Sequence, residues 1–172
     1  VAYLGRFGIS PARAVEVYRP LGPATVEAVS QNPYLLCAEP LFLKFKQVDT
    51  MAAELQLAQD GSLRVWAGLS YTLRHNSGNG HTCLPKEQLL ATAARFLGVS
   101  EAAVERELDT ALAEGEAAVY ACGGRDYVYL PDLLQAERDI AARLWDLTRY
   151  PAPQPKGLER NIQVLEQAQG FA

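Results

Sequence analysis

The residues best suited to chemistry form a short segment near the start of the chain, Phe7-Gly8-Ile9-Ser10-Pro11. Gly8 lacks a Cβ and can adopt a positive φ, which predicts a turn whose amide groups face outward and approach an anion closely. Ser10 is a preferred N-cap residue and Pro11 a preferred first helical residue, so a helix begins here with its positive end beside that anion. The segment therefore predicts that Gly8, Ile9 and Ser10 donate main-chain N–H groups to a phosphate.

A glycine turn that joins two helices and binds phosphate through its main chain is the pattern of a helix-hairpin-helix motif. Arg13 lies one turn into the second helix and adds a positive charge, which predicts a further phosphate contact. An ordinary corner between two packed helices is the alternative, because such a short pattern also occurs by chance.

Composition limits how this chain can meet DNA. The 172 residues are 49% hydrophobic and carry a formal net charge of -4, so no global positive field draws the protein to nucleic acid, and any contact must be local. No apolar run reaches the length of a membrane span and no signal-peptide pattern opens the chain, which predicts a cytoplasmic protein. The start at Val1, directly before the hairpin motif, is typical of a fragment of a longer protein.

Hydrophobic periodicity and turn signals predict a mainly α fold in three parts. Residues 1–60 are expected to form a helical domain that contains the hairpin, with helices over 11–21, 23–31 and 47–57. Residues 61–150 read as helix, strand, helix, helix and a small β-hairpin at Gly123-Gly124, which is the order of a winged helix, followed by a helix from Pro131. Residues 151–172 are expected to form a proline-rich linker and a last helix.

The sequence carries no recognisable enzymatic site. No glycine-rich loop ends in Gly-Lys-Ser or Gly-Lys-Thr, so the chain itself is expected to hydrolyse no ATP, to contain no catalytic residue and to bind no cofactor. His75, His81 and Cys83 are close in sequence, but no Cys-x-x-Cys pair completes a ligand set, so no metal site is expected. Three aromatic residues lie at apolar helical positions and are expected to be buried: Trp66, Tyr71 and Trp145.

Four segments, taken in order and spacing, resemble the N-terminal region of the standalone RecD-like ATP-dependent DNA helicases: Leu4–Gly22, Asn32-Pro33-Tyr34, Gly80–Pro85 and Val128–Pro131 followed by Ala136-Glu137. Each segment is weak alone, and together they are much more specific. The resemblance implies a tandem helix-hairpin-helix array and a small mixed domain, placed before a motor that moves 5′ to 3′ on single strands with ATP and Mg. The motor is missing from these residues, and Gly157–Ala172 is similar to its lead-in.

The second hairpin departs from the family pattern. The family has Gly-Ile-Gly-Phe-Lys where this chain has Phe42-Leu43-Lys44-Phe45-Lys46, so both glycines are absent. Without them we expect this turn not to adopt the geometry that binds phosphate through the main chain. Lys44 and Lys46 are expected either to meet phosphate through their charge or to be ordinary solvated residues. Phe42 and Phe45 are expected to pack inward or to stack on a base.

These observations lead to two functional hypotheses. The first is a non-catalytic helicase fragment that grips the DNA backbone without reading sequence, with DNA, single-stranded or at a junction, and the motor of the same chain as partners. The second is a docking module that positions the motor or a repair partner and touches no DNA. The acidic residues of the helix after Ser100 favour the second hypothesis, because they would repel phosphate.

Overall fold

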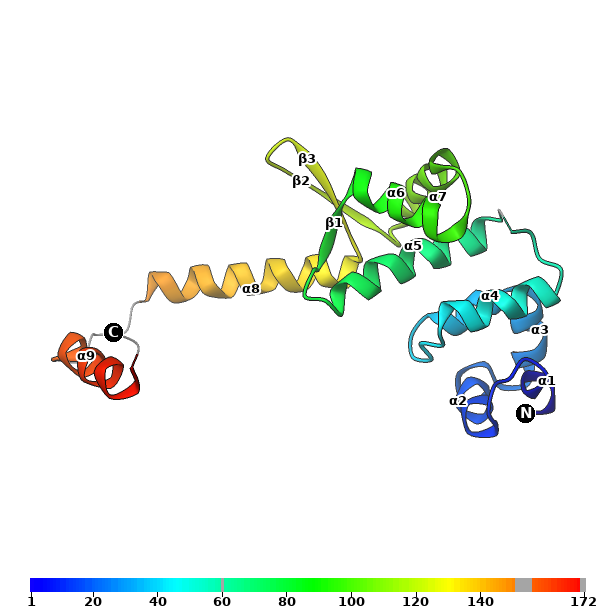
Figure 1. The fold of residues 1–172 in the computed structure, drawn as a ribbon, viewed down its shortest axis with the longest axis horizontal. Helices are drawn as coiled ribbons and strands as arrows, with labels where there is room; N and C mark the ends of the chain where they lie inside the picture. Colours follow the sequence, from blue (N-terminus) through cyan, green and yellow to red (C-terminus); the bar gives the residue numbers. More distant parts are fainter. Residues whose placement is uncertain (60, 151–155, 171–172) are drawn as a thin grey trace. The chain divides into compact units, whose positions relative to one another are not determined.

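A computed structural model describes residues 1–59, 61–150 and 156–170 of the chain. It divides the chain into two compact units, residues 1–134 and residues 135–172. Figure 1 shows the elements along the chain. The expected domain boundaries near residues 60 and 150 stay predictions.

The first part of unit 1 is helical. The elements in order are α1 (Ala2–Gly5), α2 (Pro11–Leu21), the 3-10 helix η1 (Gly22–Ala24), α3 (Thr25–Gln31), the 3-10 helix η2 (Pro33–Cys37) and α4 (Phe45–Glu54). The helix expected over residues 47–57 therefore starts two residues earlier. Lys44 is the extended N-cap residue and the buried Phe45 opens the helix, while a positive φ at Gln56 follows its end.

The second part of unit 1 combines helices with a small sheet. Its elements are α5 (Ser62–Ser77), β1 (Cys83–Pro85), α6 (Lys86–Leu97), α7 (Glu101–Glu114), β2 (Ala118–Cys122) and β3 (Arg125–Tyr129). The strands form an antiparallel sheet in the order β1-β3-β2, with Cys83 opposite Tyr129 and Val119 opposite Val128. The mainly α fold class is confirmed, and so is the expected order of helix, strand, helix, helix and hairpin.

Local sequence signals fix the ends of these elements. Ser100 caps α7 by accepting a hydrogen bond from the amide of Ala103 at 3.3 Å. Gly98 and Gly115 end α6 and α7 in the left-handed conformation that glycine favours. Gly123 and Gly124 both have positive φ, which suits the two-residue turn between β2 and β3.

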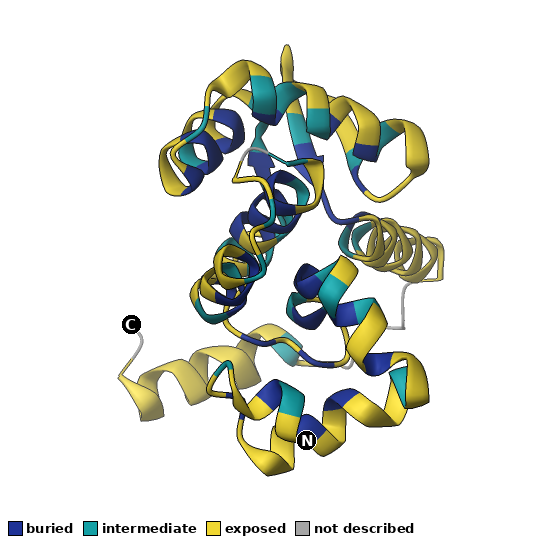
Figure 2. Ribbon diagram, turned by 90° about the vertical axis from the view of Figure 1, so that its right-hand side faces the viewer, coloured by how far each residue is buried: buried dark blue, intermediate teal, exposed yellow. Residues whose placement is uncertain are grey.

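One continuous apolar core runs through unit 1, and its buried residues come from both the helical and the mixed part. Helix α5 packs against α6 and α7 and also contacts α4 and η2. The closest approach is at Gly68 of α5, where a Cβ would lie 2.5 Å from a methyl carbon of Leu97. Figure 2 shows buried and exposed residues interspersed along the helices, and α5 buries seven of its residues between Arg64 and Leu73. This packing holds the turns of the helical part against the mixed part.

A polar network ties the same elements together. The guanidinium of the buried Arg64 in α5 donates two hydrogen bonds to the Asp49 carboxylate of α4, at 2.7 and 3.1 Å. It also donates to the carbonyl of Leu97, the last residue of α6, at 2.9 Å, and to the carbonyl of Gln59 at 2.7 Å. The helical periodicity of the sequence does not indicate that Arg64 links these helices, because its hydrogen-bond partners come together only in the fold.

Burial alone would raise the pKa of the Asp49 carboxyl, but hydrogen bonds from Arg64 and from Tyr34 outweigh it, and that pKa lies below its ordinary value. The Tyr34 hydroxyl donates to the same carboxylate at 2.7 Å. Its own pKa is raised, first by burial and then by the neighbouring Asp49. Asp49 therefore stays charged in the fold, where two donors satisfy it.

Helix α8 (Pro131–Arg149) begins in unit 1 and continues into unit 2, which also holds α9 (Leu158–Gln169). Leu134 is the buried residue of α8, and α9 buries none. Trp145 is 63% exposed and Tyr71 of α5 is 37% exposed, so the expectation that both are core residues is wrong. Trp66 packs half-buried against the core. Most of the expected proline-rich linker, residues 151–155, lies outside the described residues.

We predict that Asp49→Asn lowers the free energy of unfolding by about 3 kcal/mol at pH 7, because it leaves the Arg64 charge uncompensated. The folded pKa of Asp49 is depressed, so its contribution is complete above the unfolded value of about 3.9 and is lost as the pH falls through the lower folded value. The loss should therefore shrink below about pH 4. Urea unfolding of both proteins between pH 3 and 7 measures it.

Asp109→Asn is the matched control, because the Asp109 side chain is 64% exposed. It should change the free energy of unfolding by less than about 0.5 kcal/mol. An equal loss for Asp49→Asn at pH 3 and pH 7 would show that ionisation of Asp49 does not support the fold.

Candidate nucleic-acid interface

The first turn, between α1 and α2, has the backbone that the sequence predicts. Gly8 has a φ of 70°, and a Cβ placed on it would meet no atom within 4 Å, so the space beside it is open. Ile9 is 4% exposed and belongs to the core. The turn therefore anchors itself with one side chain and leaves its glycine at the surface.

The amide groups of this turn are not arranged as expected. The amide of Gly8 donates to the carbonyl of Gly5 at 3.1 Å, and the amide of Ile9 donates to the carbonyl of Leu4 at 3.3 Å. The expectation that these two amides face an external anion is wrong, because both complete the end of α1. Sequence reasoning could not foresee this, since a C-terminal helix cap and an anion-binding turn use the same glycine.

The donors that remain lie at the start of α2. Ser10 caps the helix by accepting the amide of Arg13 at its hydroxyl, at 3.4 Å, and the amide of Ala14 at its carbonyl, at 2.8 Å. The amides of Ser10 and Ala12 have no acceptor within the part of the chain that the structure describes. Both belong to the positive end of a helix of 11 residues, where an anion is favoured.

The second turn, between η2 and α4, repeats the backbone of the first. Phe42 takes the place of Gly8 and has a φ of 45° although it is not glycine. Leu43 is 7% exposed, as Ile9 is in the first turn. Lys44 is an extended N-cap residue, as Ser10 is. The turn therefore reaches a positive φ without glycine, while the expectation that it does not bind phosphate through its main chain stays a prediction.

Neighbouring contacts explain how a phenylalanine is held at positive φ. The Phe42 ring is 50% exposed, and the Arg74 guanidinium lies over it, 5.4 Å from the ring centroid. The amides of Phe42 and Leu43 donate to the carbonyls of Ala38 and Leu36. A bulky residue with positive φ is strained by about 1–2 kcal/mol, which these contacts offset. Phe45, in contrast, is buried at 4% exposure.

The two turns are joined by a reciprocal pair of hydrogen bonds. Gln47 of α4 donates through Nε2 to the carbonyl of Gly8 at 3.3 Å. Arg13 of α2 donates through Nη2 to the carbonyl of Leu41 at 2.9 Å, and its other terminal nitrogen pairs with Glu16. Each helix thus holds the turn that precedes the other. Arg13 is a positioning residue in this structure, which the sequence did not indicate.

Lys44 and Lys46 remain the open cations of this surface. Both are exposed, and neither ammonium has an acceptor among residues 1–59, 61–150 and 156–170. Lys44 replaces the serine cap of the first turn, so its charge stands at the place where Ser10 stands in α2. Gly8, Ile9 and Ser10 lie in the first turn and Arg13 lies in α2 directly after it. The Arg13 and Gln47 hydrogen bonds connect that turn to the one that precedes α4.

Helix α7 has the opposite charge. Glu105 and Asp109 pair with Lys86 of α6 at 2.9 and 4.0 Å. Burial raises the pKa of the Glu107 carboxyl, and the charges of Glu114 and Glu116 raise it further. The expectation that α7 meets solvent or protein and not phosphate stays a prediction.

In the described ranges no three His, Cys, Asp or Glu side chains are grouped as a metal site. No helix of those ranges is long and apolar enough to cross a membrane.

Residues 1–83 match a protein-family model described as the ATP-dependent RecD2 DNA helicase HHH domain, where HHH stands for helix-hairpin-helix. The match includes both turns and the whole of α5 and ends at the first residue of β1.

We predict that Gly8→Ala lowers the free energy of unfolding by about 1 kcal/mol, because alanine resists a φ of 70°. Gly5→Ala is the matched control, since Gly5 is helical and a Cβ there also meets no atom within 4 Å. Gly5→Ala should raise the free energy of unfolding by about 0.5 kcal/mol. Thermal unfolding measures both, and equal effects of the two substitutions would contradict the positive φ at Gly8.

Proposed function

We propose that residues 1–83, a RecD2 helicase HHH domain, bind the phosphate backbone of DNA without reading its sequence, beside the ATP-driven motor of a longer protein. The family match supports a DNA context. One observation carries the proposal further: the amides of Ser10 and Ala12 stand unpaired at the positive end of α2, next to a glycine with open space around it.

The second turn adds charge to the first. Lys44 and Lys46 lie at the start of α4, and Gln47 of the same helix bonds the first turn. Amide donors at one turn and lysines at the other could meet neighbouring phosphates of one strand. So few contacts give weak binding, and two lysines give only a shallow salt dependence, with a logarithmic slope of about −2. In the longer protein, ATP and Mg would be bound by the motor, and these residues would only hold the DNA near it.

Ser10→Asp tests the first turn without removing its cap, because aspartate is as good an N-cap residue as serine. The added negative charge should repel phosphate and lower the affinity for DNA about tenfold or more at low salt. Ser10→Asn, which caps without charge, should keep the affinity. Fluorescence anisotropy with a labelled oligonucleotide measures both.

Ser100→Asp is the matched control, because Ser100 caps α7 with the same geometry as Ser10 caps α2. It should leave binding unchanged. If Ser10→Asp binds as tightly as Ser100→Asp, the first turn takes no part in DNA binding. Repeating the titration across salt concentrations tests the second turn: Lys44→Gln and Lys46→Gln should each reduce the salt slope by about 1.

A docking function is the second candidate, and the exposed apolar residues of α8 favour it. Ile140, Leu144 and Leu147 are 58%, 58% and 69% exposed, and their spacing places them on one side of the helix. Exposed apolar residues in such a row are typical of a protein contact. Amide hydrogen exchange in α8 should slow in the longer helicase if the motor covers this side, and an unchanged rate would refute docking there.

A further inference from the structure

A group of aromatic rings lies beside the second turn, on α5 and α6. Tyr71 and Phe96 are stacked, with ring centroids 5.4 Å apart and planes 13° apart. Tyr71 and His75, one helical turn apart on α5, are also stacked, at 6.0 Å and 16°. Phe96, Tyr71 and His75 thus form three nearly parallel rings, which we name the ring ladder.

The ring ladder is anchored on one side and open on the other. Buried Phe45, the first residue of α4, contacts Tyr71 at 5.7 Å and Phe96 at 5.0 Å between centroids. Phe96 nevertheless remains 45% exposed and Tyr71 37% exposed, and His75 is also exposed. Core packing does not account for three neighbouring rings at the surface, because Phe45 is buried in the core and the ladder lies outside it.

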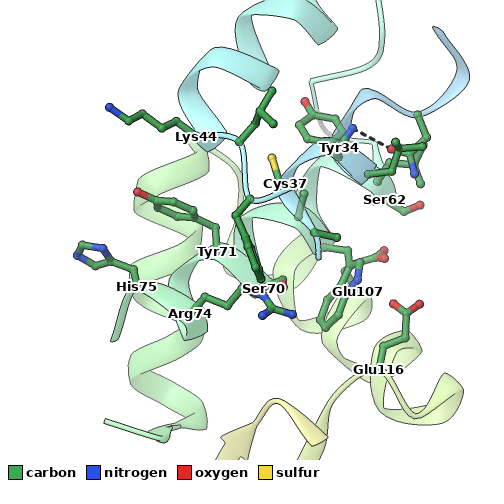
Figure 3. A pocket seen from close by; sticks show the side chains of 18 of the residues that line it. Tyr34, Cys37, Lys44, Ser62, Ser70, Tyr71, Arg74, His75, Glu107 and Glu116 are labelled. Carbon is green, nitrogen blue, oxygen red and sulfur yellow. Dashed lines mark hydrogen bonds between the residues drawn. The ribbon is translucent and has the colours of Figure 1, made fainter. Parts of the chain in front are cut away.

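Positive groups border the ring ladder. Figure 3 shows Lys44, Tyr71 and His75 projecting to the same side of a groove of about 780 Å³ that all three line. Arg74 lies between them and the interior of the groove, where it covers the Phe42 ring and is 3.8 Å from Glu39. Its Nε atom is buried and has no acceptor within the described residues.

The acidic side chains that line the groove lie at its other side, whereas Glu39, beside Arg74, does not line it. Glu107 and Glu116 are drawn opposite Lys44 and His75 in Figure 3, and Glu114 also lines the groove. A polyanion would therefore be repelled from the far side and attracted to the side that carries the rings. This separation of charge favours a strand that crosses the outer edge of the groove over one that enters it.

We infer that the ring ladder of Phe96, Tyr71 and His75 is a stacking site for the unpaired bases of a single DNA strand, with the outer rings Phe96 and His75 offering the free faces and Lys44 meeting a phosphate. Aromatic faces beside cations are what proteins use to hold single strands without reading sequence, since every base has a π face. The inference rests on the proposed function in placing DNA on this unit. Beyond the proposed function, the inference places a second DNA site on residues outside the two turns and gives that site a preference for unpaired bases.

The test compares two strands of about 12 nucleotides, one of thymidines and one abasic, which share phosphates but differ in bases. The 172-residue chain should bind the thymidine strand at least about tenfold more tightly. Tyr71→Leu and Phe96→Leu keep an apolar side chain against Phe45. Phe96→Leu removes an outer ring of the ladder, and Tyr71→Leu removes the middle ring that holds Phe96 and His75 parallel. Each should abolish most of that preference and leave binding of the abasic strand unchanged.

Tyr120→Leu is the matched control, because Tyr120 is 49% exposed on β2, away from the groove residues. It should keep the full preference. A 2-aminopurine placed in the thymidine strand should be quenched by the unchanged chain and by Tyr120→Leu, and much less by Tyr71→Leu. Thermal unfolding of every variant confirms that the fold persists.

The outcomes separate this inference from the proposed function. Equal binding of the thymidine and abasic strands, with loss of both in Ser10→Asp, overturns the ring ladder and leaves the turns as the DNA site. A base preference that disappears in Tyr71→Leu and persists in Ser10→Asp supports the ring ladder and overturns the role of the first turn. Equal loss in Tyr71→Leu and Tyr120→Leu also overturns the ring ladder.

Discussion

The bond between Arg64 and Asp49 is the constraint on which the arrangement of unit 1 depends. It joins α4 to α5, and the same guanidinium reaches the last carbonyl of α6, so one side chain fixes three helices. Helix α4 carries Lys46 and follows its N-cap residue Lys44, α5 carries Tyr71 and His75, and α6 carries Phe96. Because a buried charge is tolerated only with all its partners in place, this network allows few other arrangements of the three helices.

The two turns share one backbone and differ in chemistry. In the first, a glycine leaves room beside free amides, which suits an approaching phosphate. In the second, Phe42 adopts the same positive φ at a cost, and Arg74 covers its ring. The second turn thereby loses the open space of the first and gains Lys44 at its helix cap. The same backbone conformation thus presents main-chain donors in the first turn and side-chain charge in the second turn.

Features that depend on neighbouring residues could be predicted from the sequence, and those that depend on distant partners could not. Ser10, Ser100, Gly98 and Gly115 mark helix ends, because their caps involve residues a few positions away. The positive φ of Phe42 could not be predicted from the sequence, because the residues that stabilise it come near only in the fold. The same holds for the internal bonds of the Gly8 and Ile9 amides and for the exposed position of Tyr71, whose helical spacing is that of a core residue.

The hydrogen bonds from Gln47 to the first turn and from Arg13 to the second have a consequence for any long ligand. They hold the two turns at a fixed separation, so a polymer held at one of them has its next segment confined near the other. That second encounter is governed by a local effective concentration and no longer by how much ligand is in solution. Two individually weak contacts can then retain a polymer that neither contact would bind stably alone.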